Sequence, residues 1–226
     1  MRSALVTGGS SGIGFALARM LRDEEYEVTV VARQPDKLDT AARELGATAV
    51  AANLADADEC VRVVAAHTDR CGGMDVLVNS AGLGVGGPFA DQDTKRVDLQ
   101  LDVNLRSTLI VTRESLPLLR STKGQIVTIA SIAGTIPTPS LAVYGATKAA
   151  LIAFTNSLNR EEADHGIRAT AICPAFVATP MTDWTGIPAE EMIQVDDVVD
   201  LVQAVLHLSP RARVPQIVVE RVGDTV

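Results

Sequence analysis

The sequence has few aromatic residues and no cluster of basic residues. Phe, Trp and Tyr make up only 3% of its 226 residues, so a core has to be built mainly from Ala, Val, Leu and Ile. Hydrophobic residues still account for 47% of the chain, which excludes a disordered protein. The net charge is −8, and the sequence contains no run of Lys or Arg. The chain therefore lacks the cationic surface that nucleic-acid binding requires.

Cysteine, histidine and long apolar runs are also scarce. The three cysteines show no paired spacing, which is typical of reduced thiols. His67, His165 and His207 have no carboxylate or second histidine at ligand spacing, so we expect solvated helix positions and no metal site. No apolar run reaches the ~18 residues of a membrane span, and we expect no signal peptide, because too few apolar residues precede the first glycines. We expect a cytoplasmic protein without a membrane partner.

Short β-branched runs alternate with longer amphipathic stretches along the chain. Several runs are almost continuously apolar, as expected where helices cover both faces of a parallel sheet. The pattern predicts one doubly wound α/β domain over residues 1–226, with a mainly parallel sheet of about seven strands. Strands are expected at 3–7, 27–33, 47–52, 74–82, 124–131, 167–174 and 215–220, and helices at 12–23, 36–46, 56–70, 94–121, 143–165 and 195–208.

A glycine-rich turn follows the first predicted strand directly. Its sequence is Gly8-Gly9-Ser10-Ser11-Gly12-Ile13-Gly14, and a helix is expected to begin there. Such a turn places the N–H groups of a helix N-terminus against an anion, which suits the pyrophosphate of a dinucleotide. Glycines at this spacing also occur in plain strand-to-helix turns, so the turn alone leaves a purely structural role open.

The end of the second predicted strand indicates which dinucleotide fits. An acidic side chain there would bond a free ribose 2′-hydroxyl and repel a 2′-phosphate. The chain has Val31-Ala32-Arg33 instead, and an Arg forms charge-assisted hydrogen bonds to phosphate. We expect NADP(H) to be preferred, with NAD(H) as the alternative; a solvated loop cation is the other interpretation of Arg33.

Three residues near the fifth predicted strand suggest proton transfer. Ser131 ends that strand, and Tyr144 and Lys148 follow at a spacing of four, which places both on one face of a helix. A Tyr phenol has a reference pKa of about 10, so it exchanges protons near neutral pH only where positive charge stabilises its phenolate. We expect Lys148 to supply that charge.

These motifs together resemble the short-chain dehydrogenase/reductase family. The matches are Thr-Gly-x-x-x-Gly-x-Gly at 7–14, Asn-Ser-Ala-Gly at 79–82 and the Ser131, Tyr144 and Lys148 pattern, and the resemblance spans essentially the whole chain. It implies a Rossmann-type sheet of order 3-2-1-4-5-6-7. It also implies that Tyr144 protonates a carbonyl oxygen, Ser131 bonds the same oxygen, and Lys148 also holds the nicotinamide ribose, while Asn104 keeps a water in a proton relay.

The resemblance further implies a set of cofactor contacts. Residues 174–179 resemble a segment beside the nicotinamide, with Ala175 replacing the usual Gly, and Asn53 stands where the family usually has an Asp that bonds adenine. Both departures bear on cofactor affinity and leave hydride transfer intact. The implied contacts are Gly8, Ser10, Ser11, Gly12, Ile13, Gly14, Arg33, Asn53, Leu54, Asn79, Ala81, Gly82, Tyr144, Lys148, Pro174, Val177 and Thr179.

The substrate side carries a weaker signal. The segment from Thr179 to Asp196 corresponds to a short substrate lid, in which Trp184 either lies over the substrate or anchors the loop. We expect a small carbonyl or alcohol substrate, as in carbonyl reductases or 3-oxoacyl-(acyl-carrier-protein) reductases. The alternatives are an NAD-dependent alcohol dehydrogenase and a dinucleotide sensor without catalysis. The resemblance implies a homodimer or homotetramer formed through the helices of Asn104 and Tyr144.

Overall fold

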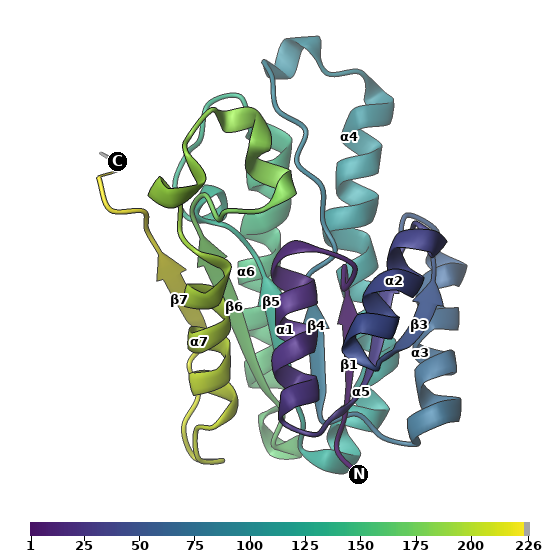
Figure 1. The fold of residues 1–226 in the computed structure, drawn as a ribbon. Helices are drawn as coiled ribbons and strands as arrows, with labels where there is room; N and C mark the ends of the chain where they lie inside the picture. Colours follow the sequence, from purple (N-terminus) through teal and green to yellow (C-terminus); the bar gives the residue numbers. More distant parts are fainter. Residues whose placement is uncertain (224–226) are drawn as a thin grey trace.

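The computed structural model describes residues 1–223, and within them seven parallel strands form one sheet (Figure 1). The expected domain extends to residue 226, so its last three residues lie outside this range. The strand order is β3-β2-β1-β4-β5-β6-β7, which confirms the predicted order. The strands are β1 (Ser3–Thr7), β2 (Glu27–Ala32), β3 (Thr48–Ala51), β4 (Val76–Asn79), β5 (Gln125–Ile129), β6 (Arg168–Pro174) and β7 (Gln216–Val219).

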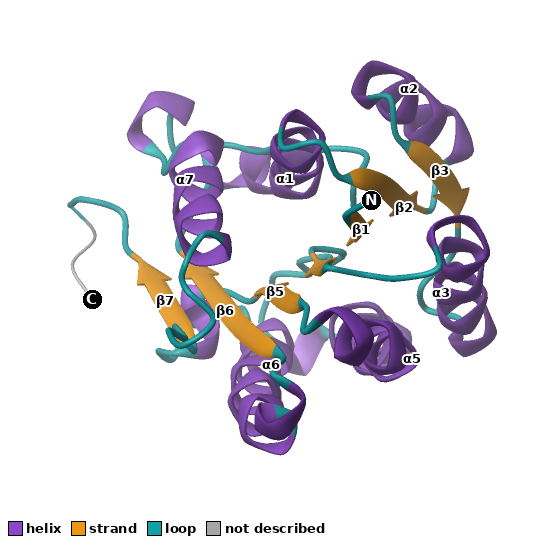
Figure 2. Cartoon of the chain, turned by 90° about the horizontal axis from the view of Figure 1, so that it is seen from below, coloured by secondary structure: helices purple, strands orange, loops and turns teal. Residues whose placement is uncertain are grey.

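Helices cover both faces of this sheet (Figure 2). Helices α1, α2 and α7 lie on one face, and α3, α5 and α6 lie on the other. Helix α3 shows how local signals set the ends, because Asp56 caps its first turn and Gly72 ends it in the left-handed conformation. No helix within residues 1–223 is both long and apolar enough to cross a membrane. The helices are α1 (Gly12–Asp23), α2 (Pro35–Leu45), α3 (Ala57–Cys71), α4 (Thr94–Gln100), α5 (Ser107–Thr122), α6 (Ala142–Glu161) and α7 (Val195–Leu206).

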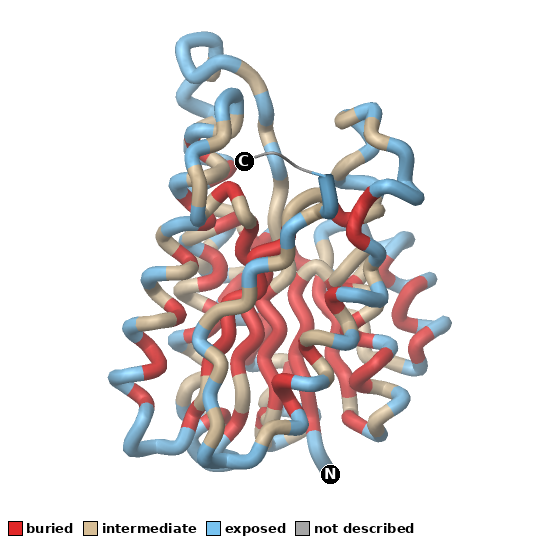
Figure 3. Tube along the Cα trace, turned by 90° about the vertical axis from the view of Figure 1, so that its left-hand side faces the viewer, coloured by how far each residue is buried: buried red, intermediate tan, exposed pale blue. Residues whose placement is uncertain are grey.

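Buried residues are concentrated in the strands and recur along the helices that cover them (Figure 3). In β1, Ala4 and Val6 pack against the layer of α1, α2 and α7, while Leu5 packs against the opposite layer. This alternation follows from the two-residue period of a strand. Because both faces of β1 are covered, every residue of that strand is buried, as its continuous apolar run predicts.

The helix expected at 94–121 is interrupted near its middle. Helix α4 passes into a π-helical segment (Leu101–Arg106) before α5 begins at Ser107. Asn104 lies in this segment and is fully buried. A π-helical turn contains one residue more than an α-helical turn, and such turns are frequent at functional sites. The hydrophobic pattern gave no sign of this interruption.

His67 is buried in α3, which corrects the expectation of a solvated position. None of its surface is exposed. Its Nε2 lies 3.1 Å from the Gly73 carbonyl oxygen and its Nδ1 lies 2.9 Å from the Thr29 hydroxyl oxygen. Nε2–H donates to the carbonyl, so Nδ1 accepts from Thr29 in the neutral ring. The predicted helix was right, but the side chain lies on its sheet-facing side.

This burial makes stability depend on pH. Burial lowers the pKa of His67, so the folded protein binds this proton less readily than the unfolded chain does. The neutral ring therefore contributes stability that is complete above the unfolded pKa of about 6.5 and is lost as the pH falls through the lower folded pKa. We expect His67→Gln to flatten the fall in urea midpoint between about pH 7 and pH 5. His165→Gln, at an exposed histidine, should keep the wild-type dependence of the urea midpoint on pH. The same pH dependence in the wild type and both variants would show that His67 does not cause it.

Candidate active site

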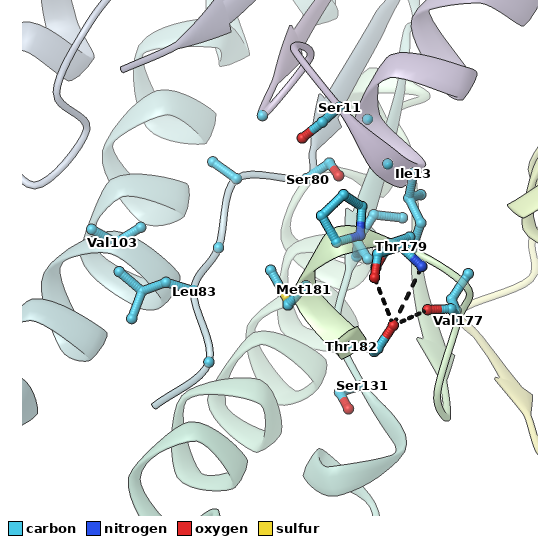
Figure 4. Close-up of a pocket in the computed structure, with 18 of the residues that line it drawn as sticks. Ser11, Ile13, Ser80, Leu83, Val103, Ser131, Val177, Thr179, Met181 and Thr182 are labelled. Atoms are coloured by element: carbon cyan, nitrogen blue, oxygen red, sulfur yellow. Dashed lines mark hydrogen bonds between the residues drawn. The ribbon is translucent and has the colours of Figure 1, made fainter. Parts of the chain in front are cut away.

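A cavity of about 650 Å³ opens at the carboxyl ends of the strands (Figure 4). Its centre lies where β1 and β4 are neighbours and the chain winds outward in both directions. The Thr7 hydroxyl bridges these two strand ends, because its oxygen accepts hydrogen bonds from the N–H groups of Ser80 (3.1 Å) and Ala81 (3.2 Å). Open α/β sheets bind ligands at such a switch point, and the volume falls in the usual range for ligand pockets.

The glycine-rich turn forms one wall of the cavity. A Cβ atom on Gly14 would overlap the Gly8 carbonyl oxygen, so the close approach of turn and helix requires glycine. Helix α1 begins at Gly12, and its N-cap residue Ser11 makes no side-chain capping bond. The first turn also contains no acidic residue. The N-cap side chain therefore accepts no hydrogen bond from the N–H groups at this helix end, which fits the binding of a pyrophosphate.

Arg33 and Lys37 line the cavity beyond the end of β2. Both side chains are exposed. Lys37 lies in the first turn of α2, and both side chains border the same cavity, so the two cations can approach the same anion. Arg33 was predicted from the sequence and Lys37 was not, although a cation in the first turn of the helix predicted at 36–46 was a usable signal.

Ser131, Tyr144 and Lys148 line the opposite part of the cavity. Ser131 follows β5, and the other two lie on α6. Lys148 is only 4% exposed, and its Nζ donates a hydrogen bond of 2.7 Å to the Ile129 carbonyl oxygen. Burial lowers the pKa of Lys148 to about 8. The structure thus brings together the three residues that the sequence pattern grouped.

The phenol of Tyr144 differs from the expectation in one respect. Burial raises its pKa, and a hydrogen bond with Ser131 opposes that shift. The Nζ of Lys148 lies 5.5 Å from the centre of the Tyr144 ring and donates its hydrogen bond to the Ile129 carbonyl oxygen. The net pKa shift of Tyr144 is therefore upward, opposite to the lowering that we expected from Lys148. Tyr144 is held as a neutral phenol, which is the form that donates a proton.

Two predicted asparagines lie outside the cavity wall. Asn104 is buried, and its amide holds the Leu83 backbone, accepting from its N–H (2.8 Å) and donating to its carbonyl oxygen (2.9 Å). Its Nδ2 also lies 3.4 Å from the Thr147 hydroxyl oxygen. Asn79 donates to the Thr112 hydroxyl. Both asparagines support segments that reach the cavity.

The segment after β6 closes one side of the cavity (Figure 4). The Thr182 hydroxyl donates a hydrogen bond of 2.6 Å to the Val177 carbonyl oxygen, lies 2.8 Å from the Thr179 carbonyl oxygen and accepts from the Thr179 N–H at 3.3 Å. Trp184 follows, packs edge-on against Phe176 and lines the cavity. Of the two positions considered for Trp184, the structure places it on the cavity.

All the other predicted site residues border the cavity. The lining residues that were not predicted come from several segments, including the loop between β5 and α6, which contributes Ile136 and Leu141. The predicted residues in the wall are Gly8, Ser10, Ser11, Gly12, Ile13, Gly14, Arg33, Asn53, Leu54, Ala81, Gly82, Ser131, Tyr144, Lys148, Pro174, Val177 and Thr179.

Comparisons with known proteins agree with this geometry. The sequence model of the family described as short chain dehydrogenase matches residues 2–186. An uncharacterized oxidoreductase of Staphylococcus epidermidis is 35% identical over 222 residues, covering 97% of this chain and 96% of the relative. An uncharacterized oxidoreductase of Staphylococcus aureus is 32% identical over 223 residues, with the same two coverages.

Solved structures show the same fold. The chain is similar to an actinorhodin polyketide ketoreductase determined with NADPH, with a TM-score of 0.88 and 31% identity over 97% of this chain and 95% of the other. It is also similar to an alcohol dehydrogenase of the archaeon Thermococcus sibiricus complexed with 5-hydroxy-NADP, with a TM-score of 0.92 and 26% identity over 100% and 99% of the two chains. The chain therefore belongs to the short-chain dehydrogenase family and is an oxidoreductase of CH–OH and C=O groups.

Proposed function

We propose that this protein is an NADPH-dependent carbonyl reductase in which Tyr144 donates the proton. The observation that carries the proposal is the arrangement of one cavity. The neutral Tyr144 phenol and Ser131 lie in one part of it, while Arg33 and Lys37 line another part beyond the end of β2. A phosphorylated dinucleotide fits both parts of the cavity. Its 2′-phosphate binds cations, and its nicotinamide transfers a hydride beside a group that donates a proton.

The cavity wall fits such a cofactor along its length. The free N–H groups at the start of α1 would hold the pyrophosphate, Arg33 and Lys37 the 2′-phosphate, and Asn53 and Leu54 the adenine. The relatives determined with NADPH and with 5-hydroxy-NADP support a phosphorylated dinucleotide as the cofactor. When bound, NADPH supplies a hydride to the carbonyl carbon.

The side chains near Tyr144 handle the proton. Tyr144 gives its phenolic proton to the substrate oxygen, and Ser131 donates a hydrogen bond to that oxygen as negative charge develops. Lys148 lies beside the resulting phenolate and stabilises it. Asn104 acts as a positioning residue, since its amide fixes the backbone of Leu83 in the cavity wall. We propose this support as a role of Asn104 beside the water-holding role that the family resemblance implies.

Binding and turnover measured together test this function. Trp184 is the only tryptophan and lines the cavity, so its fluorescence should report titration with NADPH and NADH. Absorbance at the nicotinamide band then follows turnover of ketones and aldehydes. Tight binding of NADPH with consumption of a carbonyl is the expected result. Preference for NADH with alcohol oxidation would indicate the dehydrogenase alternative, and binding without any turnover would indicate a sensor.

Thr182 should matter for cofactor affinity although its hydroxyl bonds only to the protein backbone. Thr182→Val removes the partner of the Val177 carbonyl and the Thr179 N–H, the residues that we place beside the nicotinamide. Leaving buried backbone groups unpaired costs about 1 kcal/mol or more, so we expect a roughly five- to tenfold rise in the NADPH dissociation constant.

Two variants control this prediction. Thr182→Ser keeps the hydroxyl and should restore the wild-type dissociation constant. Thr185→Val removes a neighbouring hydroxyl that bonds the Thr182 carbonyl oxygen and the Ile187 N–H, and should leave NADPH binding within about twofold. An equal loss in Thr182→Ser and Thr182→Val would show that the hydroxyl does not position the segment.

A further inference from the structure

The charges around the cavity are distributed unevenly. Within residues 1–223, the cavity wall contains three charged side chains, Arg33, Lys37 and Lys148, and no Asp, Glu or His. Arg33 and Lys37 come from the end of β2 and the start of α2, away from Tyr144 in the fold. Lys148 is buried and already bonded to the Ile129 carbonyl oxygen. Around the reacting atoms, the part of the chain that the structure describes therefore offers no free charge to a substrate.

The wall near Tyr144 is predominantly apolar. Trp184 is 66% exposed and Met181 is 46% exposed, although both border the cavity. Such large apolar side chains gain most when another apolar surface covers them. Phe176 packs edge-on against Trp184 with ring centres 6.4 Å apart, which gives this wall an aromatic corner. The apolar lining residues on this side are Leu83, Val103, Ile132, Ile136, Leu141, Phe176, Met181 and Trp184.

The segment over the cavity carries only negative charge. Residues 180–194 contain Asp183, Glu190 and Glu191 and no Lys, Arg or His. All three acidic side chains are exposed, and Glu191 lies 3.8 Å from Arg221. The protein as a whole has a net charge of −8. An anionic substrate would approach against this field and would find no cation free to bind it near Tyr144.

We propose that the substrate is an uncharged, largely apolar aldehyde or ketone, with an aromatic or alkyl group that covers Trp184 and Met181. This inference rests on the proposed reductase function. In the reaction, the hydride of NADPH forms a C–H bond at the carbonyl carbon, and the π electrons of the C=O bond take the Tyr144 proton at oxygen. NADPH becomes NADP⁺ and the carbonyl becomes an alcohol. Carbonyl compounds that carry a carboxylate or phosphate are excluded.

A matched pair of aldehydes tests the proposal. Para-methylbenzaldehyde and para-carboxybenzaldehyde differ in the charge at one position remote from the carbonyl. We expect kcat/KM with NADPH to be at least about tenfold higher for the neutral aldehyde. Trp184 fluorescence, measured with each aldehyde and the enzyme–NADP⁺ complex, reports binding where no hydride is available. Equal or better binding and turnover of the carboxylate would overturn the substrate assignment. Selective binding without turnover of either aldehyde would contradict the reductase function and leave the substrate assignment supported.

Variants at Trp184 test whether the apolar wall contacts the substrate. Trp184→Ala should lower kcat/KM for para-methylbenzaldehyde about tenfold and leave the NADPH dissociation constant within about twofold. Phe89→Ala is the matched control, because Phe89 is 63% exposed but lies outside the cavity wall; it should change neither value. Trp184→Arg should reduce the preference for the neutral aldehyde at least about tenfold. An unchanged preference in Trp184→Arg would show that this wall does not contact the substrate.

Discussion

Tyr144→Phe is expected to lower kcat by about 10²–10⁴-fold, the usual contribution of a positioned acid. The substitution removes only the phenolic oxygen and leaves the aromatic ring beside Lys148. Because the ring and the rest of the cavity wall are kept, NADPH binding should change by no more than about threefold. Single-turnover absorbance of NADPH, with the neutral aldehyde in excess, measures the chemical step directly.

Tyr26→Phe provides a matched control for this experiment. Tyr26 is the only other tyrosine, lies outside the cavity wall and bonds Arg2 through its hydroxyl. This variant should keep the wild-type kcat. If Tyr144→Phe turned over as fast as the wild type, another group would have to supply the proton, and the mechanism proposed for this site would be wrong.

Arg33→Ala is expected to weaken NADPH binding by about 1.5–3 kcal/mol, or roughly 10- to 150-fold. The guanidinium group would lose charge-assisted hydrogen bonds to the 2′-phosphate. NADH lacks that phosphate, so its dissociation constant should change by no more than about twofold. Lys37→Ala should act in the same direction with a smaller effect, since an exposed ammonium group makes a less directional contact.

Arg43→Ala controls for a general change in surface charge. Arg43 lies on the same helix as Lys37, is exposed and bonds the Asp39 carbonyl oxygen outside the cavity wall. Measured at one ionic strength, this variant should bind NADPH as the wild type does. Equal weakening of NADPH and NADH by Arg33→Ala would mean that Arg33 does not recognise the phosphate.

The arrangement of strands and helices was largely predictable from the sequence, because the central strands all need apolar residues on both faces. A central parallel strand is covered on both faces, so Ala4, Leu5 and Val6 all have to be apolar. The burial of His67 was not predictable in the same way, because its hydrogen bonds are satisfied inside the protein by Gly73 and by Thr29, which is 38 residues away in the sequence. The expected oligomer and cellular location stay predictions.

The site was predictable where a short motif fixes the geometry. The turn from Gly8 to Gly14 and the Tyr144 and Lys148 pair are local patterns, and the structure places both on one cavity. The substrate wall combines Leu83, Phe176 and Trp184 from segments far apart in the sequence. Their proximity is a property of the assembled sheet. The direction of the Tyr144 pKa shift was missed for the same reason, since burial depends on the whole surrounding structure.

The π-helical segment between α4 and α5 sets a length requirement. Each residue of an α-helix advances by about 100° around the axis, so the extra residue in this turn rotates everything on one side of it relative to the other. Removing one residue from 101–106 would turn either Asn104 away from Leu83 or Val111 and Leu119 away from the core. In chimeras of this chain with its relatives, residue count across this segment has to be preserved even where exposed side chains are exchanged freely.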